Sequence, residues 1–446
     1  MKRFLRTELV RDVFKLVVGV GAGRIVLFVA LPLATLIYSP AQFELLAVLM
    51  AVVTTISVAA CLRFDVAIPV ADSDEEAAYL LVISLCAAMI FALVLLVPVL
   101  IAPNWLARAI GTPRIAQYLW LVPFGVLLVA SYSALQFWAV RRRRFGAIAR
   151  TRVSQAIVGA SFMLGVGWVS MSSYGLLVGT LLTICAGGGV LAWQALRLDR
   201  PMLKSVNLPR MGQVVRQFKK YPLISTPDAL ANIGGIQVPI IIIAAASETE
   251  AGQLFLAIQI LNAPIALFGA SIGQVYASRL PQAQSDGTLA PLTLKVMQNL
   301  ALVGVVPLCV IGLLAPLLMG RILGSEWELA GSIMSFMVPW VVLQLLSSPI
   351  SFVMLATGRQ NSMLALTCFG GLLRIAAVSF AVQNGAAIYS LAHIWSSAVF
   401  YLVCLLVYAR ASSVIRLPEF RVLVLCVVLA LIGYGAASFV VAQQGV

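Results

Sequence analysis

Residues 79–102 read YLLVISLCAAMIFALVLLVPVLIA and contain no charged side chain. An α-helix needs about 20 consecutive apolar residues to cross the hydrocarbon core of a membrane. The apolar residues here run without interruption, whereas a strand of a membrane barrel alternates apolar with polar residues. This stretch therefore predicts one membrane-spanning helix.

The rest of the chain has the same character. Of its 446 residues, 62% are hydrophobic and 10% are charged, and the mean hydropathy is +1.03. A soluble domain carries roughly 25% charged residues, so this chain cannot coat a water-soluble surface. The fold class that follows is an all-α polytopic membrane protein. Its thirteen predicted spans are 14–38, 42–62, 79–102, 116–140, 153–171, 175–196, 222–246, 252–277, 296–319, 332–356, 363–382, 386–408 and 422–442.

Basic residues outnumber acidic ones, 30 to 16. No nucleic-acid-binding module fits between the apolar stretches, and the cytoplasmic loops of membrane proteins are enriched in lysine and arginine. With a cytoplasmic N-terminus and alternating spans, 25 of the 30 fall on the cytoplasmic side. Three fall outside (Arg108, Arg114 and Arg321), and two, Arg24 and Arg374, lie within spans. We therefore expect a multi-pass protein with its N-terminus in the cytoplasm.

The sequence offers no set of side chains for catalysis. It has no Walker A motif, and its lone histidine, His393, lies within a predicted span, where packing is the simpler interpretation and proton relay the alternative. The seven cysteines lie in or beside apolar stretches without a CxxC pair, which argues against zinc and disulfides. We expect no catalytic residues, no metal and no cofactor, and hence not an enzyme.

The longest link between spans divides the chain. We expect an N-terminal six-helix lobe at 1–196, a basic cytoplasmic linker at 197–221, a C-terminal six-helix lobe at 222–408 and an extra transmembrane helix within 409–446. A weak internal repeat agrees with this division, because the 47–69 segment resembles the 257–281 segment in its alanine, arginine and proline positions. Lobes with an even number of spans are parallel repeats, related by an axis along the membrane normal.

The first span contains a glycine-rich motif and an arginine, and each of them has two possible interpretations. Gly19-x-Gly21-x-Gly23 resembles a phosphate-binding loop, but such a loop follows a strand, and here the glycines lie within a span. Gly19 and Gly23 also form a GxxxG pair, which allows two helices to approach closely; we favour this interpretation. Arg24 follows directly, and a cation there either faces a cavity or partner or reaches back to the membrane surface.

Two further charges lie within spans. Arg374 is in the middle of the eleventh span, where reaching the surface is least plausible, so it is either functional or part of an internal ion pair. Asp228 lies near the cytoplasmic end of the seventh span. It could pair with an arginine, bind a coupling cation or proton, or simply belong to a helix start, because Thr226-Pro227-Asp228 has that pattern.

Short motifs follow one another in a fixed order along residues 14–408. They are LPLATLIYSP at 31–40, LRFDVAIP at 62–69, YP at 221–222, GSEW at 324–327, PW at 339–340 and GRQ at 358–360. This ordered set resembles the Wzx-type O-antigen and polysaccharide flippases, the polysaccharide-transport branch of the multidrug/oligosaccharidyl-lipid/polysaccharide exporter superfamily. The chain departs from that family at Glu44, where the family has glycine, and in its extra last span.

The resemblance implies a function. It implies two six-helix lobes around a cavity open to one side at a time, in the bacterial inner membrane. It implies movement of an undecaprenyl-pyrophosphate-linked oligosaccharide from the cytoplasmic to the periplasmic leaflet, for O-antigen, lipopolysaccharide or exopolysaccharide synthesis. Arg24 and Arg374 are the substrate-binding candidates, because arginine forks suit phosphate. Besides this lipid-linked substrate and the membrane lipids, a polysaccharide polymerase and a chain-length regulator are expected partners.

Other assignments follow from the same residues. Asp228 is the candidate for coupling or an ion pair, and Arg63, Asp65 and Arg279 are candidates for a cytoplasmic gate. A cation-coupled multidrug exporter of the same superfamily is the first alternative, although only Asp228 is an acid clearly within a span. A non-catalytic membrane component of cell-envelope assembly is the second.

Overall fold

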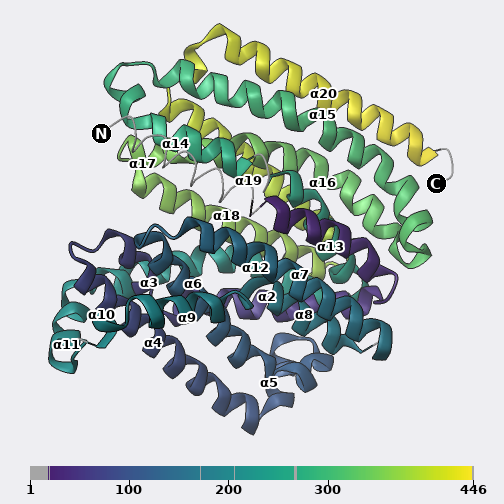
Figure 1. The fold of residues 1–446 in the computed structure, drawn as a ribbon. Coiled ribbons are helices and arrows are strands. Elements are labelled where there is room, and N and C mark those ends of the chain that lie inside the picture. Colours follow the sequence, from purple (N-terminus) through teal and green to yellow (C-terminus); the bar gives the residue numbers. More distant parts are fainter. Residues whose placement is uncertain (1–18, 20, 171, 205, 266–268, 444–446) are drawn as a thin grey trace. The chain divides into compact units, whose positions relative to one another are not determined.

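The computed structural model describes residues 19, 21–170, 172–204, 206–265 and 269–443, and within these ranges the regular secondary structure is helical (Figure 1). The chain forms two compact units, residues 1–245 and 246–446, and each is described by itself. The all-α polytopic fold expected from the sequence is confirmed. The position of the boundary between the two expected lobes stays a prediction.

The first unit begins, in the described residues, with a helix at Gly21–Thr35. Local signals explain where its helices start. Ser39 and Gln42 form a capping box ahead of α2, with Pro40 in its first turn, and the Ser73 hydroxyl accepts from the Glu76 amide at the start of α4. The elements are α2 (Pro40–Ala60), α3 (Phe64–Ala67), η1 (Ile68–Val70), α4 (Asp74–Ile101), α5 (Pro103–Ile110), η2 (Pro113–Tyr118), α6 (Leu121–Arg141), α7 (Phe145–Ser170), α8 (Ser173–Cys185), α9 (Gly188–Leu198), α10 (Arg200–Lys204), α11 (Leu208–Gln217), the π-helical turn η3 (Tyr221–Ser225) and α12 (Thr226–Ala246).

The second unit is organised around α16. In the span that contains α16, Ser325–Ala356, 61% of an apolar 18-residue window is buried, against 11% in the span Pro418–Ser438 of α20, so α16 lies in the core and α20 at the edge. Figure 1 shows α20 beside α15, and the Tyr434 hydroxyl of α20 bonds Ser335 of α16. The elements are α13 (Glu248–Pro264), α14 (Ala270–Ser285), α15 (Leu289–Leu323), η5 (Ser325–Trp327), α16 (Glu328–Ser347), η6 (Ser348–Ser351), α17 (Phe352–Ala356), α18 (Gln360–Gln383), α19 (Tyr389–Ala411), η7 (Val414–Arg416) and α20 (Pro418–Gln443).

Eleven helices in the described part of the chain are long and apolar enough to cross a membrane. Two predicted spans are not among them. The first is described only as the short helix Gly21–Thr35, and the eighth as α13 and α14 on either side of residues 266–268, which lie outside the description.

The outer surface of the helices is apolar. Val169 is 87% exposed and Leu302 is 79% exposed, within long apolar helices. Surfaces of this kind are stable against lipid and not against water. The protein is a multi-pass membrane protein.

Candidate functional site

Arg374 is a buried cation in the second unit. It lies on α18 with 5% of its surface exposed, and its Nε donates to the Ser397 hydroxyl of α19 at 3.0 Å. Its guanidinium carbon lies 4.3 Å from the ring centre of Phe400 and 5.6 Å from that of Tyr401. In the described residues no carboxylate forms an ion pair with it. Aromatic faces and a hydroxyl stabilise the charge without neutralising it, so the group keeps its attraction for an anion.

Next along α19 lies a buried polar seam, which we define as Glu250, Gln253, Trp340, Gln344, Ser390 and His393. It joins α13, α16 and α19, which pack together, and the Ser390 amide donates to the Glu250 carboxylate. His393 meets Trp340 edge-on, with ring centres 5.3 Å apart. The packing role expected for His393 fits this contact.

Several atoms of the polar seam have unused hydrogen-bonding capacity. His393 Nδ1, Trp340 Nε1 and Gln344 Oε1 are buried without a partner in the described part of the protein. Buried polar atoms are nearly always hydrogen-bonded, to protein or to water. The seam is therefore suited to hold water molecules or the hydroxyls of a polar ligand. The sequence singled out His393, but its contact with Trp340 depends on the packing of α16 on α19.

Arg24 belongs to the first unit, on the exposed side of the helix Gly21–Thr35. The opposite side packs on α7. A Cβ added to Gly23 would come 2.8 Å from the Arg152 carbonyl oxygen, and one added to Gly19 would come 2.7 Å from Ala149 Cα. The interpretation of these glycines as a packing pair is thereby confirmed.

A second arginine accompanies Arg24. Arg152, on α7, is close enough to repel it, donates to the Gln136 side chain at 2.7 Å, and lies 5.1 Å over the Tyr132 ring. Neither arginine forms an ion pair within the described residues. Sequence reasoning placed Arg152 in a cytoplasmic loop, and only the helix packing reveals its position beside Arg24.

Asp228 is exposed in the first turn of α12. This position agrees with the helix-start interpretation, because an acid in a first turn interacts favourably with the helix dipole. In the same helix, Gln237 donates to the Thr54 hydroxyl of α2 at 3.2 Å, so this amide links two helices. A coupling role for Asp228 stays a prediction.

The three gate candidates lie in different surroundings. Arg63 is half-buried in a left-handed backbone conformation (φ 59°), and Asp65 is buried and accepts from the Ser133 hydroxyl of α6 at 2.8 Å. Arg279 is exposed on α14 of the second unit. The structure therefore brings Arg63 and Asp65 into one short segment of the first unit, and the gate itself stays a prediction.

An ion-pair network that was not predicted from the sequence holds helix ends together at one end of the first unit. Asp74 of α4 binds Arg141 at 2.9 Å and Arg142 at 2.7 Å. Asp199, which follows α9, is buried and binds Arg144 at 2.8 Å and Arg142 at 3.3 Å. Trp138 also donates its indole N–H to Asp199, at 2.9 Å. These contacts join the ends of α4, α6 and α9.

The acids that begin α4 have a double role. Asp74, Glu75 and Glu76 lie in its first turn. They also hold the basic linker, because Arg210 of α11 binds Glu75 at 2.6 Å and Gln217 donates to Glu76 at 3.3 Å. Of the four arginines 141–144, Arg141, Arg142 and Arg144 form ion pairs within the protein.

Comparison with known proteins decides the family. The profile of a family described as "polysaccharide biosynthesis protein" matches residues 32–331, more than half of the chain. The chain belongs to this family. No curated protein matches it.

Solved structures show the fold of this polysaccharide biosynthesis family member. An inward-facing multidrug resistance MATE transporter of the MOP superfamily matches with a TM-score of 0.67 and 15% identity, over 88% of this chain and 96% of that one. A MOP-superfamily transporter from Pyrococcus furiosus, described as having a binding pocket of reverse polarity, matches with a TM-score of 0.56 and 14% identity, over 91% and 96%. At these identities the likeness shows the fold alone: the MATE-like transporter fold, with twelve helices in two lobes. The family-level resemblance indicated by the sequence motifs is confirmed by the polysaccharide biosynthesis profile.

Proposed function

We propose that this protein is a flippase that moves an undecaprenyl-pyrophosphate-linked oligosaccharide from the cytoplasmic to the periplasmic leaflet of a bacterial inner membrane. The observation that carries the proposal is Arg374, a buried cation without an acidic partner in the described residues, in a member of a polysaccharide biosynthesis family. Burying a cation in a region of low dielectric costs free energy, and the binding of an anionic substrate group would offset that cost.

The chemistry of the second unit suits such a substrate. Arg374 presents a planar fork of donors, which matches the oxygens of a pyrophosphate. The polar seam offers indole, imidazole and amide atoms without partners, which suit sugar hydroxyls. In the first unit Arg24 and Arg152 provide a second pair of cations. We propose alternating access as the mechanism, with the products passed to a polysaccharide polymerase and a chain-length regulator.

The first competing function is cation-coupled drug export, because structural likeness is to multidrug transporters. Coupling of this kind needs acids that bind a cation within the membrane. Asp228, the candidate from the sequence, is exposed in the first turn of α12, and the buried Glu250 carboxylate already accepts a hydrogen bond from the Ser390 amide. This weakens the drug-export proposal. The second competing function, a non-transporting component of envelope assembly, has no feature of its own in favour of it.

A deletion strain separates these functions. We expect it to lose surface polysaccharide and to accumulate the lipid-linked oligosaccharide on the cytoplasmic side, with unchanged drug sensitivity. Unchanged polysaccharide together with increased drug sensitivity would favour the exporter. Loss of polysaccharide without accumulation of the lipid-linked precursor would favour the assembly component.

A further inference from the structure

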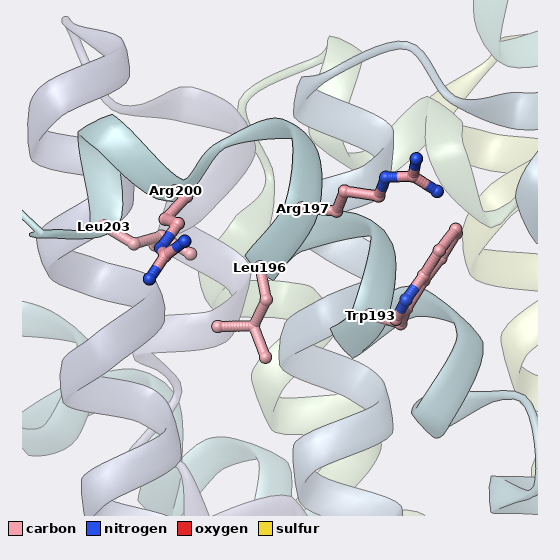
Figure 2. A pocket seen from close by; sticks show the side chains of 5 residues that line it. All are labelled: Trp193, Leu196, Arg197, Arg200 and Leu203. Atoms are coloured by element: carbon pink, nitrogen blue, oxygen red, sulfur yellow. The ribbon is translucent and has the colours of Figure 1, made fainter.

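The ends of α9 and α10 in the first unit form an open groove of about 550 Å³. Trp193, Leu196 and Arg197 come from α9, and Arg200 and Leu203 come from α10. Figure 2 shows Leu196 between the Trp193–Arg197 pair and the Arg200–Leu203 pair. The groove therefore has apolar side chains in its middle and a guanidinium on either side.

The two arginines of this groove are not neutralised. Both are exposed, and neither forms an ion pair within the part of the chain that the structure describes. Asp199 lies between them in sequence, but its carboxylate is turned to Arg142 and Arg144 and only 1% of its side chain is exposed. Because this carboxylate is buried and paired elsewhere, it does not neutralise the groove, which keeps a local positive charge.

The apolar lining places the groove at a membrane surface. Trp193 is 57% exposed and Leu196 is 61% exposed, and the guanidinium of Arg197 lies 5.0 Å over the Trp193 ring. Tryptophan and arginine gather where acyl chains meet headgroups. The neighbouring arginines 141–144 belong to the same end of the unit, and their number assigns this end to the cytoplasmic side.

We propose that this groove binds an anionic phospholipid of the cytoplasmic leaflet. The positive charge of Arg197 and Arg200 would attract its anionic headgroup, while Leu196 and Leu203 contact the start of an acyl chain. Basic pockets on the cytoplasmic side of membrane proteins are suited to such headgroups. The site is separate from Arg24 and Arg374 in sequence, and it does not depend on the proposed transport function.

Native mass spectrometry of the purified full chain, titrated with phosphatidylglycerol or phosphatidylcholine, tests the proposal. We expect tighter binding of the first phosphatidylglycerol. The double variant R197Q/R200Q should weaken that binding by about 10- to 30-fold, because each basic side chain near a headgroup contributes about one order of magnitude or somewhat less. The control R216Q/K219Q removes the same charge from exposed residues outside the groove and should leave binding unchanged.

Three results would overturn the proposal. One is equal binding of the two lipids by the unaltered protein, and another is an equal loss in the R216Q/K219Q control. The third comes from a competition experiment. If undecaprenyl phosphate displaces phosphatidylglycerol at equal concentration, the groove takes the isoprenoid carrier and not a bilayer lipid. Inorganic phosphate at millimolar concentration should not compete, because it lacks the acyl chain.

Discussion

Arg374 is held by contacts that stabilise a cation without cancelling its charge. Ser397 accepts one hydrogen bond, and the rings of Phe400 and Tyr401 cover the guanidinium. The sequence predicts an unusual charge in the eleventh span, because a single arginine interrupts apolar residues. It does not predict the aromatic contacts, because these require α18 and α19 to pack in one particular register.

Two substitutions of Arg374 distinguish the contribution of its positive charge to transport from the contribution of its planar guanidinium group. We expect R374Q to lower surface polysaccharide about 10- to 100-fold, because it removes one charged hydrogen bond to the substrate. We expect R374K to retain part of the activity, because it keeps the positive charge. Polysaccharide is measured per amount of protein in the membrane, so a folding defect is seen separately. The control is R321Q, at an exposed arginine of α15. Full activity of stably inserted R374Q would remove Arg374 from the binding site.

Asp199 is the residue on which the stability of the basic end depends most. D199N removes the charge that faces Arg142 and Arg144 and should lower the free energy of unfolding by about 2–3 kcal/mol, since it leaves the partly buried Arg144 unpaired and takes from Arg142 one of its two acidic partners. D74N is the matched control, because the Asp74 side chain is 45% exposed and its pairs are worth less than about 1 kcal/mol. Thermal unfolding in detergent measures both. A larger loss for D74N than for D199N would contradict this ranking.

At the scale of helices, close packing depends on small residues. α7 and α8 share one of the most extensive contacts in the first unit. A Cβ at Gly159 would come 2.6 Å from the Gly179 carbonyl oxygen and 2.7 Å from the Thr183 amide nitrogen. Both neighbours are backbone atoms of α8, which cannot move aside as a side chain can. The glycine therefore sets the distance between the two helices.

The variant G159A should force α7 and α8 apart and lower the free energy of unfolding by about 1–3 kcal/mol, the usual cost of overpacking. G165A on the same helix is the control, because nothing lies within 4 Å of the added Cβ. Alanine has the higher helix propensity, so G165A should be neutral or stabilising by up to about 1 kcal/mol. Equal thermal stability of the two variants would show that α7 and α8 are not in close contact.

The existence of the helices could be predicted from the length of the apolar stretches, and their starts could be predicted from local signals such as Ser39-Pro40 and Ser73. The contacts between helix ends could not be predicted from the sequence. Nothing in the sequence marks Asp74 or Asp199 as a partner of the arginines 141–144. Their pairing is a consequence of tertiary packing that brings α4, α6 and α9 together at one end.

At the scale of the whole molecule, the distribution of lysine and arginine predicts the orientation. In a cysteine-free background, N104C should react with a membrane-impermeant maleimide added to intact cells, or to spheroplasts where an outer membrane blocks the reagent. S285C should react only after the inner membrane has been permeabilised. Both positions are exposed and lie in links between spans. The reverse pattern would invert the topology and place the basic end outside.

The fold as a whole follows from the sequence more readily than the site does. Thirteen apolar stretches and their links define a polytopic helical protein, and the ordered motifs resemble the family to which the chain belongs. The site residues were foreseen only singly, as charges in unusual places. Their partners, such as Trp340 beside His393 and Arg152 beside Arg24, come from segments far apart in sequence and could not be assigned without the structure.

Purified protein in liposomes tests most directly whether the protein moves a lipid-linked oligosaccharide across a membrane. Undecaprenyl-pyrophosphate oligosaccharide with a labelled sugar is placed in one leaflet, and a membrane-impermeant oxidant on the other side reports its arrival. We predict arrival at a rate well above that of protein-free liposomes, and a loss of most of that rate with R374Q. Arrival no faster than in protein-free liposomes, with correctly folded wild-type protein, would contradict the flippase assignment.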